Sequence, residues 1–134
     1  MHRSLALAAA ALAAACATSA PLDMEAPSGA WRLAAIDGAP PSGEAPTIAF
    51  EGDRVAGFAG CNRYFAAIEQ DPNVARYFTG IGATRMACPE PAMSLETRFL
   101  ARLGETMSVR VVDGVLVFFG DEEVELMRFA PSAE

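Results

Sequence analysis

Two short segments that each carry one cysteine constrain the fold of this chain most. They are Gly60-Cys61-Asn62-Arg63-Tyr64 and Ala83-Thr84-Arg85-Met86-Ala87-Cys88, and they hold the only cysteines outside the N-terminal leader region. Glycine and asparagine tolerate left-handed backbone angles, so the first segment is expected to form a bulge or corner that redirects the chain. Short polar side chains such as those of Asn62 and Thr84 bond nearby backbone groups. Both segments are therefore predicted to fix turns around the cysteines.

The start of the chain has the pattern of an export signal. His2 and Arg3 give a weakly positive beginning, the apolar run Leu5–Leu12 follows, and small residues precede Cys16. The run is too short for a membrane-spanning helix, which needs roughly 20 residues. The chain is therefore predicted to divide into a cleaved signal peptide (1–15), a flexible tether rich in Ala, Pro, Ser and Thr (16–28), one folded domain (29–130) and a tail (131–134).

Cys16 is predicted to carry a lipid. The segment Leu12-Ala13-Ala14-Ala15-Cys16 resembles a bacterial lipobox, although the leucine lies one place further from the cysteine than is usual. Acylation would anchor the chain to a membrane without spanning it. Ala17 rather than aspartate after the cysteine favours the periplasmic side of the outer membrane. The alternative is ordinary cleavage after Ala20, which would release a soluble periplasmic protein.

Cys61 and Cys88 are predicted to form a disulfide, because paired cysteines usually bond in the oxidising envelope. Closing a loop of this size would stabilise the fold by about 3–4 kcal/mol. Buried free thiols are the main alternative. A thiol redox or metal site is a weaker one, because there is no Cys-x-x-Cys motif and the only histidine is His2 in the leader.

The composition narrows the chemistry that the chain can perform. The formal net charge is −7, and an acidic domain repels phosphate backbones, so no nucleic-acid partner is expected. All ten basic residues are arginine and no histidine follows the leader. Ser-His-Asp and Cys-His catalysis, histidine-ligated zinc and lysine Schiff-base chemistry are thereby excluded. Carboxylate chemistry remains open, although no pair of carboxylates stands out by spacing. We expect a monomer without cofactor or metal.

The rest of the chain has the pattern of short strands and one helix. Turn signals at Asp37-Gly38, Glu51-Gly52-Asp53 and Asp113-Gly114 separate apolar runs. Strands are expected at 30–36, 47–50, 54–58, 63–68, 74–81, 109–112, 115–119 and 123–129. The result is an α+β fold, with a bent antiparallel sheet or partly closed barrel of about 7–8 strands and one packed helix.

The helix is expected to begin after Pro89-Glu90-Pro91 and to end at Gly104, just past its last turn. An apolar stripe recurs at helical spacing and predicts one buried face. It consists of Ala92, Leu95, Phe99 and Leu103. The charged residues Glu96, Arg98 and Arg102 are expected to lie away from it.

The two cysteine segments, in this order behind the leader, resemble the META domain family. Supporting features are Trp31 in the first strand, Arg54-Val55-Ala56-Gly57 before the first segment and Phe99–Leu103 in the helix. The resemblance covers roughly residues 30–129, and the loop Ala39–Pro46 departs from it by its length. It implies a small α+β domain in the bacterial envelope, linked to heat shock and to tolerance of some antibiotics. It implies no catalytic residue.

We therefore expect a non-enzymatic envelope lipoprotein that acts through contacts with an unidentified envelope protein. One alternative is a binder or carrier of an apolar ligand such as a lipid. It rests on the strand Val115–Phe119, apolar on both faces, and on Tyr64, Tyr77 and Phe78, all of which could equally fill the core. The other alternative is a hydrolase that uses carboxylates alone.

The remaining residues of the two segments have predicted roles of their own. Arg63 and Arg85 could pair with carboxylates and cover apolar neighbours, or could grip an anionic ligand. Met86 is expected to fill the core rather than to bind a metal. Gly60, Asn62 and Thr84 are expected to serve the turns, with ligand binding as the alternative.

Overall fold

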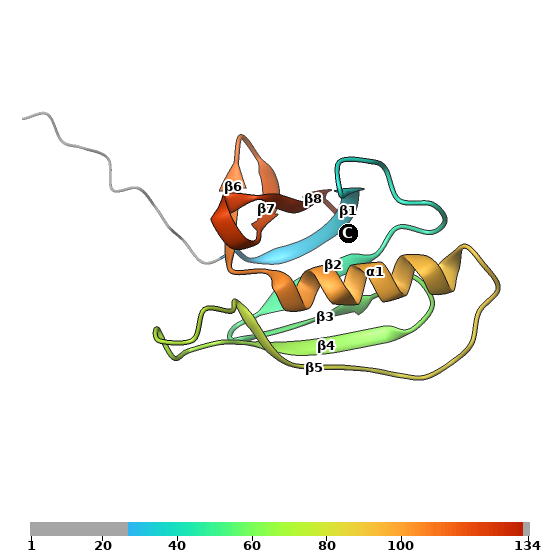
Figure 1. Ribbon diagram of the computed structural model, residues 1–134, viewed down its shortest axis with the longest axis horizontal. Helices are drawn as coiled ribbons and strands as arrows, with labels where there is room; N and C mark the ends of the chain where they lie inside the picture. The colour runs from blue at the N-terminus through green and yellow to red at the C-terminus, as the bar shows by residue number, and fades with distance from the viewer. Residues whose placement is uncertain (1–26, 133–134) are drawn as a thin grey trace, which may run out of the picture.

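The structure is a computed structural model, and it describes residues 27–132 (Figure 1). The predicted signal peptide, Cys16, most of the tether and the last two residues lie outside the described residues. The elements are β1 (Gly29–Ile36), β2 (Thr47–Glu51), β3 (Arg54–Phe58), β4 (Arg63–Ile68), β5 (Phe78–Ala83), α1 (Ala92–Glu105), β6 (Ser108–Val112), β7 (Val115–Phe119), the 3-10 turn η1 (Asp121–Glu123) and β8 (Glu125–Pro131).

The eight strands form one antiparallel sheet in the order β5-β4-β3-β2-β1-β8-β7-β6. The sheet curls into a half-barrel, and α1 lies across its opening (Figure 1). β5 and β6 are the two edge strands of the sheet. The predicted α+β fold, with a bent sheet and one helix, is confirmed.

Two hairpins follow the turn signals in the sequence. Asp113 and Gly114 both have positive φ, at 51° and 77°, and they join Val112 to its cross-strand partner Val115. Positive φ at both central residues is what a tight type I′ hairpin requires. The second hairpin joins β2 to β3, with Glu51 opposite Arg54.

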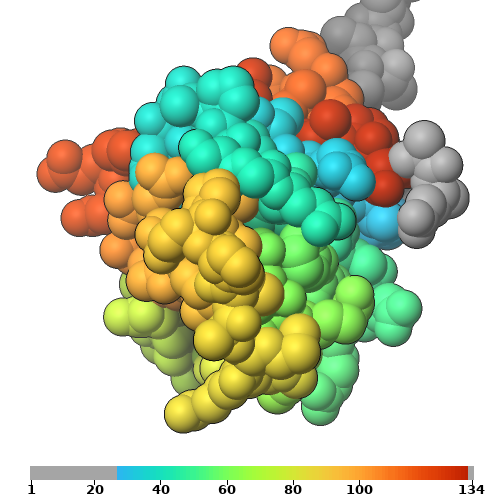
Figure 2. All heavy atoms as spheres, turned by 90° about the vertical axis from the view of Figure 1, so that its right-hand side faces the viewer, coloured from blue at the N-terminus to red at the C-terminus, as the bar shows by residue number. Residues whose placement is uncertain are grey.

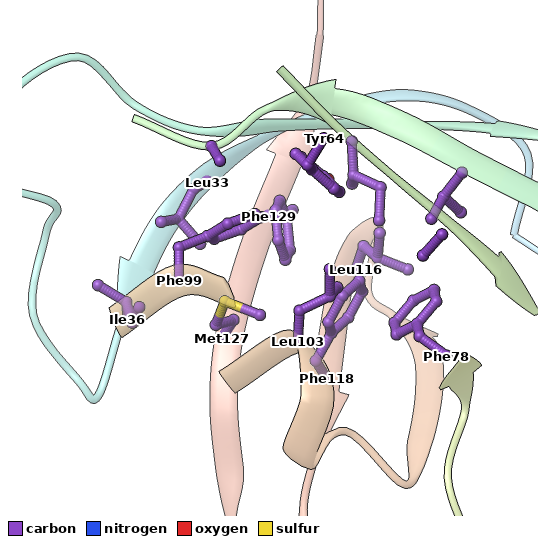
Figure 3. Close-up of a cluster of buried hydrophobic side chains, with 14 of the residues drawn as sticks. Leu33, Ile36, Tyr64, Phe78, Phe99, Leu103, Leu116, Phe118, Met127 and Phe129 are labelled. Carbon is purple, nitrogen blue, oxygen red and sulfur yellow. The ribbon is translucent and has the colours of Figure 1, made fainter. Parts of the chain in front are cut away.

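The core lies between α1 and the concave face of the sheet (Figure 3). Leu95, Phe99 and Leu103 are buried along one face of α1, as their spacing predicts. Aromatic rings link the helix to both halves of the sheet, because Phe99 meets Tyr64 of β4 edge to face at 5.2 Å and Phe129 of β8 edge to face at 6.4 Å. The shortest ring separation, 4.7 Å, joins Phe118 to Phe129. Such contacts stabilise by about 0.5–1.5 kcal/mol beyond the area they bury.

Strand β7 is apolar on both faces because both faces are covered. Leu116 and Phe118 belong to the core, and Val117, which points to the opposite face, is also buried. On that opposite face the guanidinium of Arg110 lies 4.2 Å from the centre of the Phe119 ring. An arginine in this position contributes a cation–π contact and shields the ring from water.

Strand β5 starts later than the sequence predicts. Val74 to Tyr77 lie outside any strand, and β5 begins at Phe78. The reason is tertiary: the Tyr77 N–H donates to the carbonyl of Thr106 (2.8 Å), and Arg76 Nη1 donates to the carbonyl of Gly104 (2.9 Å). This segment is therefore bound to the end of α1.

Two further boundaries differ from the prediction. Gly104 lies inside α1, and Thr106 takes the position after the helix, where its N–H bonds the carbonyl of Leu103. The last strand begins at Glu125, because Glu122 and Glu123 both have positive φ and belong to η1. A left-handed backbone cannot continue a strand.

The loop between β1 and β2 packs against the N-terminal half of α1, where the cyan-to-teal chain meets the yellow chain (Figure 2). A Cβ at Gly43 would lie 3.4 Å from the Pro91 Cγ atom.

Within residues 27–132, no helix is both long and apolar enough to cross a membrane.

Candidate functional site

The corner between β3 and β4, residues 59–62, lies directly against the backbone of α1. Gly60 has φ of +130°, and a Cβ there would lie 3.1 Å from both the Ala92 carbonyl oxygen and the Glu96 nitrogen. A side chain at position 60 would be strained in this conformation and would also crowd the helix. Glycine therefore sets how closely the corner approaches α1.

The disulfide between Cys61 and Cys88 joins this corner to the segment that leads from β5 to α1. The two Cα atoms are 5.9 Å apart, within the usual range for a disulfide. The predicted pairing of these cysteines is confirmed. It ties the corner to the chain just before the start of α1.

Asn62 is buried and uses all four hydrogen bonds of its side-chain amide. Its Oδ1 accepts from the Met86 N–H (2.6 Å) and the Thr84 hydroxyl (3.1 Å). Its Nδ2 donates to the Met86 carbonyl (3.0 Å) and to Glu96 Oε2 (2.7 Å). The Met86 N–H and carbonyl fix which way the amide points, since each can meet only one end of it. Asn62 thus acts like a strand partner for residues 84–86.

Glu96 is the residue of this cluster whose place differs from the sequence-based expectation. The expectation puts it away from the apolar stripe, yet it is only 6 % exposed. Its Oε1 accepts from the backbone N–H groups of Cys61 (3.2 Å) and Asn62 (2.5 Å). Its Oε2 accepts from the side-chain Nδ2 of Asn62. The spacing does contain a signal, because Glu96 stands four residues after Ala92 and therefore on the stripe.

The other predicted site residues are exposed. Thr84 touches the cluster through its hydroxyl, whereas Arg63 and Arg85 project to the surface. Within residues 27–132, neither arginine has a carboxylate in ion-pair distance, so the pairing suggested for them is not observed. The expectation that Met86 fills the core is wrong, because its side chain is 62 % exposed.

A shallow depression of about 480 Å³ lies beside this cluster. Its floor contains Asn62 and Glu96, and its sides come from β5, the segment after it and α1. The apolar side chains at its rim are those of Ile81, Met86, Met93 and Leu100. Asn62 uses all four hydrogen bonds of its amide and Glu96 accepts three, so the depression offers a partner mainly apolar side chains, backbone groups and the guanidinium of Arg85.

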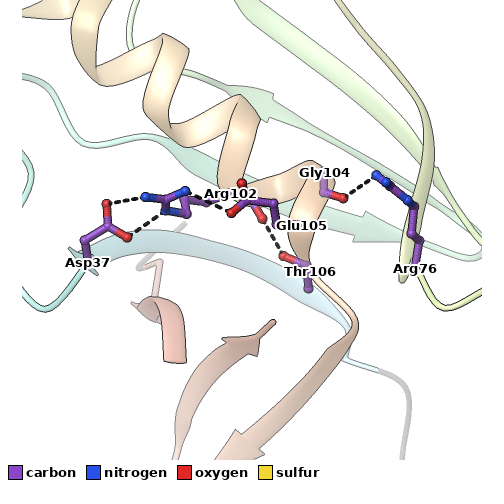
Figure 4. A network of polar contacts seen from close by, with 6 residues as sticks. All are labelled: Asp37, Arg76, Arg102, Gly104, Glu105 and Thr106. Atoms are coloured by element: carbon purple, nitrogen blue, oxygen red, sulfur yellow. Dashed lines mark hydrogen bonds and ion pairs between the residues drawn. The ribbon is translucent and has the colours of Figure 1, made fainter. Parts of the chain in front are cut away.

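A second polar network ties the C-terminal end of α1 to the end of β1 (Figure 4). Arg102 Nε donates to Asp37 Oδ1 (2.7 Å), and its Nη1 donates to Glu105 Oε2 (2.9 Å). The hydrogen bond to Asp37 is the largest cause of the raised pKa of Arg102. These groups are partly exposed, so the pairs stabilise the fold by at most about 1 kcal/mol each. The network is structural.

Tyr64 connects the candidate site to the core. Its hydroxyl donates to the carbonyl of Thr47 (2.7 Å), and burial raises the pKa of its phenol well above the ordinary value.

In the part of the chain that the structure describes, no three His, Cys, Asp or Glu side chains gather in a way that could hold a metal ion.

Comparisons with known proteins address the whole domain. No curated protein matches this chain. Among solved structures, an NMR structure of a protein from Burkholderia xenovorans has 23 % identity and a TM-score of 0.61, covering 79 % of this chain and 83 % of that one. A second NMR structure has 19 % identity and a TM-score of 0.57, covering 76 % and 87 %. At these identities the likeness shows the fold alone. The profile of the META domain matches residues 22–133, and the chain therefore belongs to the META domain family.

Proposed function

We propose that this chain is a lipid-anchored protein of the bacterial envelope that has no catalytic role and acts through contacts with another envelope protein. The observation that carries the contact is the free edge of β5. This strand is first in the sheet order, so among residues 27–132 only one of its edges is bonded to a neighbouring strand. A free edge presents backbone N–H and carbonyl groups that can add a strand from a partner.

The surroundings of this edge favour an extended segment of a partner protein. The apolar rim of the depression, with the exposed side chain of Met86, runs beside the edge. Methionine side chains adapt to partners of varied shape. Arg85 is exposed on the same rim, so we propose that the bound segment carries apolar residues and at least one carboxylate.

The anchor is proposed from Cys16 and the leader before it. The family resemblance adds a role in stress survival or envelope maintenance.

The apolar-ligand alternative has less support, because the aromatic rings of Tyr64 and Phe78 pack on Phe99 and Phe118. The alternative of a carboxylate hydrolase is tested by single substitutions of Asp and Glu residues.

The contact is tested in cells by placing a photo-crosslinking amino acid at position 85, with position 124 as control. Val124 is also exposed, at 57 %, but lines a hollow at the C-terminal end of α1. We expect a defined adduct from position 85 that is absent from position 124, and loss of both adduct and stress survival in Met86→Asp. Identical adducts from both positions, or full survival of Met86→Asp under heat, detergent and antibiotic, would refute the contact.

The anchor is tested separately by the intact mass of the protein extracted from its native membranes. We expect the mass of a chain that begins at an acylated Cys16, and release into the soluble fraction for Cys16→Ala. A mass that begins near residue 21 would refute the anchor and would leave the β5 contact unaffected.

A further inference from the structure

The hairpin of β2 and β3 opens at one end, away from its turn. The cross-strand pairs run from Glu51 opposite Arg54 to Ala49 opposite Ala56, and no ladder pair joins Thr47 to β3. The Thr47 hydroxyl instead accepts from the Phe58 N–H (3.1 Å). The backbone carbonyl of Thr47 accepts from the Tyr64 hydroxyl (2.7 Å). Side chains therefore replace the ladder at this end of the hairpin.

Glycine at position 57 lets the backbone of Thr47 approach β3 closely at this end of the hairpin. A Cβ at Gly57 would lie 2.2 Å from the Thr47 carbonyl oxygen, so no larger residue fits without moving the strand. A hollow of about 350 Å³ lies over the open end. Its volume is in the range of sites for small molecules. Phe58 supplies aromatic surface to its walls.

Two guanidinium groups line the same hollow from opposite sides. Arg32 on β1 stands opposite Thr47, and Arg63 on β4 stands opposite Phe58, so one row of residues crosses four strands with an arginine at each end. Alternation along the strands puts this row on the outer face, away from the core. Both arginine side chains are exposed and both line the hollow.

The charge of these arginines is not balanced by an ion pair. Within the described residues, Arg102, Arg110 and Arg128 each have a carboxylate within 4.0 Å, whereas Arg32 and Arg63 have none. In the same part of the chain Arg54, Arg76, Arg85 and Arg98 also have none, so Arg32 and Arg63 are distinguished by lining one hollow together. Glu44 also lines the hollow and is the one carboxylate among its lining residues.

We propose that this hollow binds the carboxylate or phosphate group of a small molecule or of a lipid headgroup, held between Arg32 and Arg63. Guanidinium groups recognise both anions through charge-assisted, often bidentate hydrogen bonds. Phe58 contacts the body that carries the anion. Glu44 repels the anion and so limits its affinity. The site lies on the outer face of β1 to β4, so it is separate from the proposed contact along β5.

The test is an NMR titration of the purified protein at low ionic strength with inorganic phosphate and with succinate. We expect saturable shifts of the Thr47 and Phe58 amides. Arg32→Gln or Arg63→Gln should weaken binding by roughly tenfold to a hundredfold, the effect of losing one charged hydrogen-bonded partner. Glu44→Gln should strengthen it. Arg54→Gln is the matched control, because Arg54 is an exposed arginine at the other end of β3 and does not line the hollow.

The source of the anion is resolved by a vesicle arm. Binding to phosphatidylglycerol vesicles but not to phosphatidylcholine vesicles, lost in the Arg32→Gln/Arg63→Gln double variant, would assign a lipid headgroup. Binding of the free anions without vesicle binding would assign a soluble ligand. The proposal is overturned if neither anion nor vesicles shift the Thr47 and Phe58 amides, or if Arg54→Gln weakens binding as much as Arg32→Gln.

Discussion

Replacing Asn62 by aspartate should strongly destabilise the protein, although the two side chains have almost the same shape. The change turns the Nδ2 donor into an oxygen that faces Glu96 Oε2, where the present distance is 2.7 Å, and the Met86 carbonyl, at 3.0 Å. Two hydrogen bonds are lost, and two carboxylates come into contact in a buried site. Like charges so close cannot both ionise.

The size of the effect follows from the least costly way to relieve this contact. One of the two carboxyl groups takes up a proton, which restores a donor between them. For a carboxyl group with an ordinary pKa of about 4, protonation at pH 7 costs about 4 kcal/mol. We therefore expect Asn62→Asp to lower the free energy of unfolding by about 3–5 kcal/mol at pH 7. The loss should shrink by about 2–3 kcal/mol between pH 7 and pH 5, since each pH unit changes the cost by about 1.4 kcal/mol.

Urea unfolding followed by circular dichroism at pH 5, 6 and 7 measures this, with the disulfide kept intact. Asn73→Asp is the matched control, because Asn73 Nδ2 also donates to a carboxylate, that of Asp71, at 3.0 Å in an exposed turn. There water screens the charges, and the loss should be below about 1 kcal/mol at every pH. A loss for Asn62→Asp that equals the control, or that does not change with pH, would refute the arrangement of Asn62 and Glu96 described above.

Three further predictions concern the same region. Replacing Cys61 and Cys88 together by serine should lower the free energy of unfolding by about 3–4 kcal/mol, because the disulfide spans 27 residues; equal urea midpoints for the variant and the oxidised protein would contradict this. Gly60→Ala should destabilise by about 1–3 kcal/mol through its left-handed backbone and its contact with α1, whereas Gly104→Ala, with only a 3.8 Å contact inside the helix, should stabilise by about 0.5–1 kcal/mol; thermal unfolding that ranks the two variants in the opposite order would refute the packing. Because burial raises the pKa of Tyr64, folding favours its neutral form, so the stability it contributes is complete below about pH 10 and is lost as the pH rises further; alkaline urea titrations should show a smaller loss in Tyr64→Phe than in the unmodified protein.

Much of the fold follows from local signals in the sequence. Asp113-Gly114 determines its hairpin because these two residue types accept the positive φ that the turn needs. The spacing of Leu95, Phe99 and Leu103 determines which face of α1 is buried, because only side chains at helical spacing lie on one face. A sequence without lysine, and without histidine after the leader, limits the chemistry of the chain whatever its fold.

Tertiary contacts decided what the same local signals left open. Glu96 is a charged residue on an apolar stripe, and whether it turns outward or is buried depends on the donors that the 59–62 corner brings to it. The Val74–Tyr77 segment has the pattern of a strand, yet its backbone and Arg76 bond the end of α1.

The hollow between Arg32 and Arg63 is the clearest example of the difference between what the sequence predicts and what the tertiary structure decides. The sequence by itself predicted that β1 to β4 are strands, and the structure shows that both arginines are exposed. Only the order of the strands in the sheet decided that these two residues, far apart along the chain and at opposite ends of a row that crosses four strands, share one hollow. Local propensity acts over a few residues, whereas the charge and shape of a surface depend on which distant strands become neighbours.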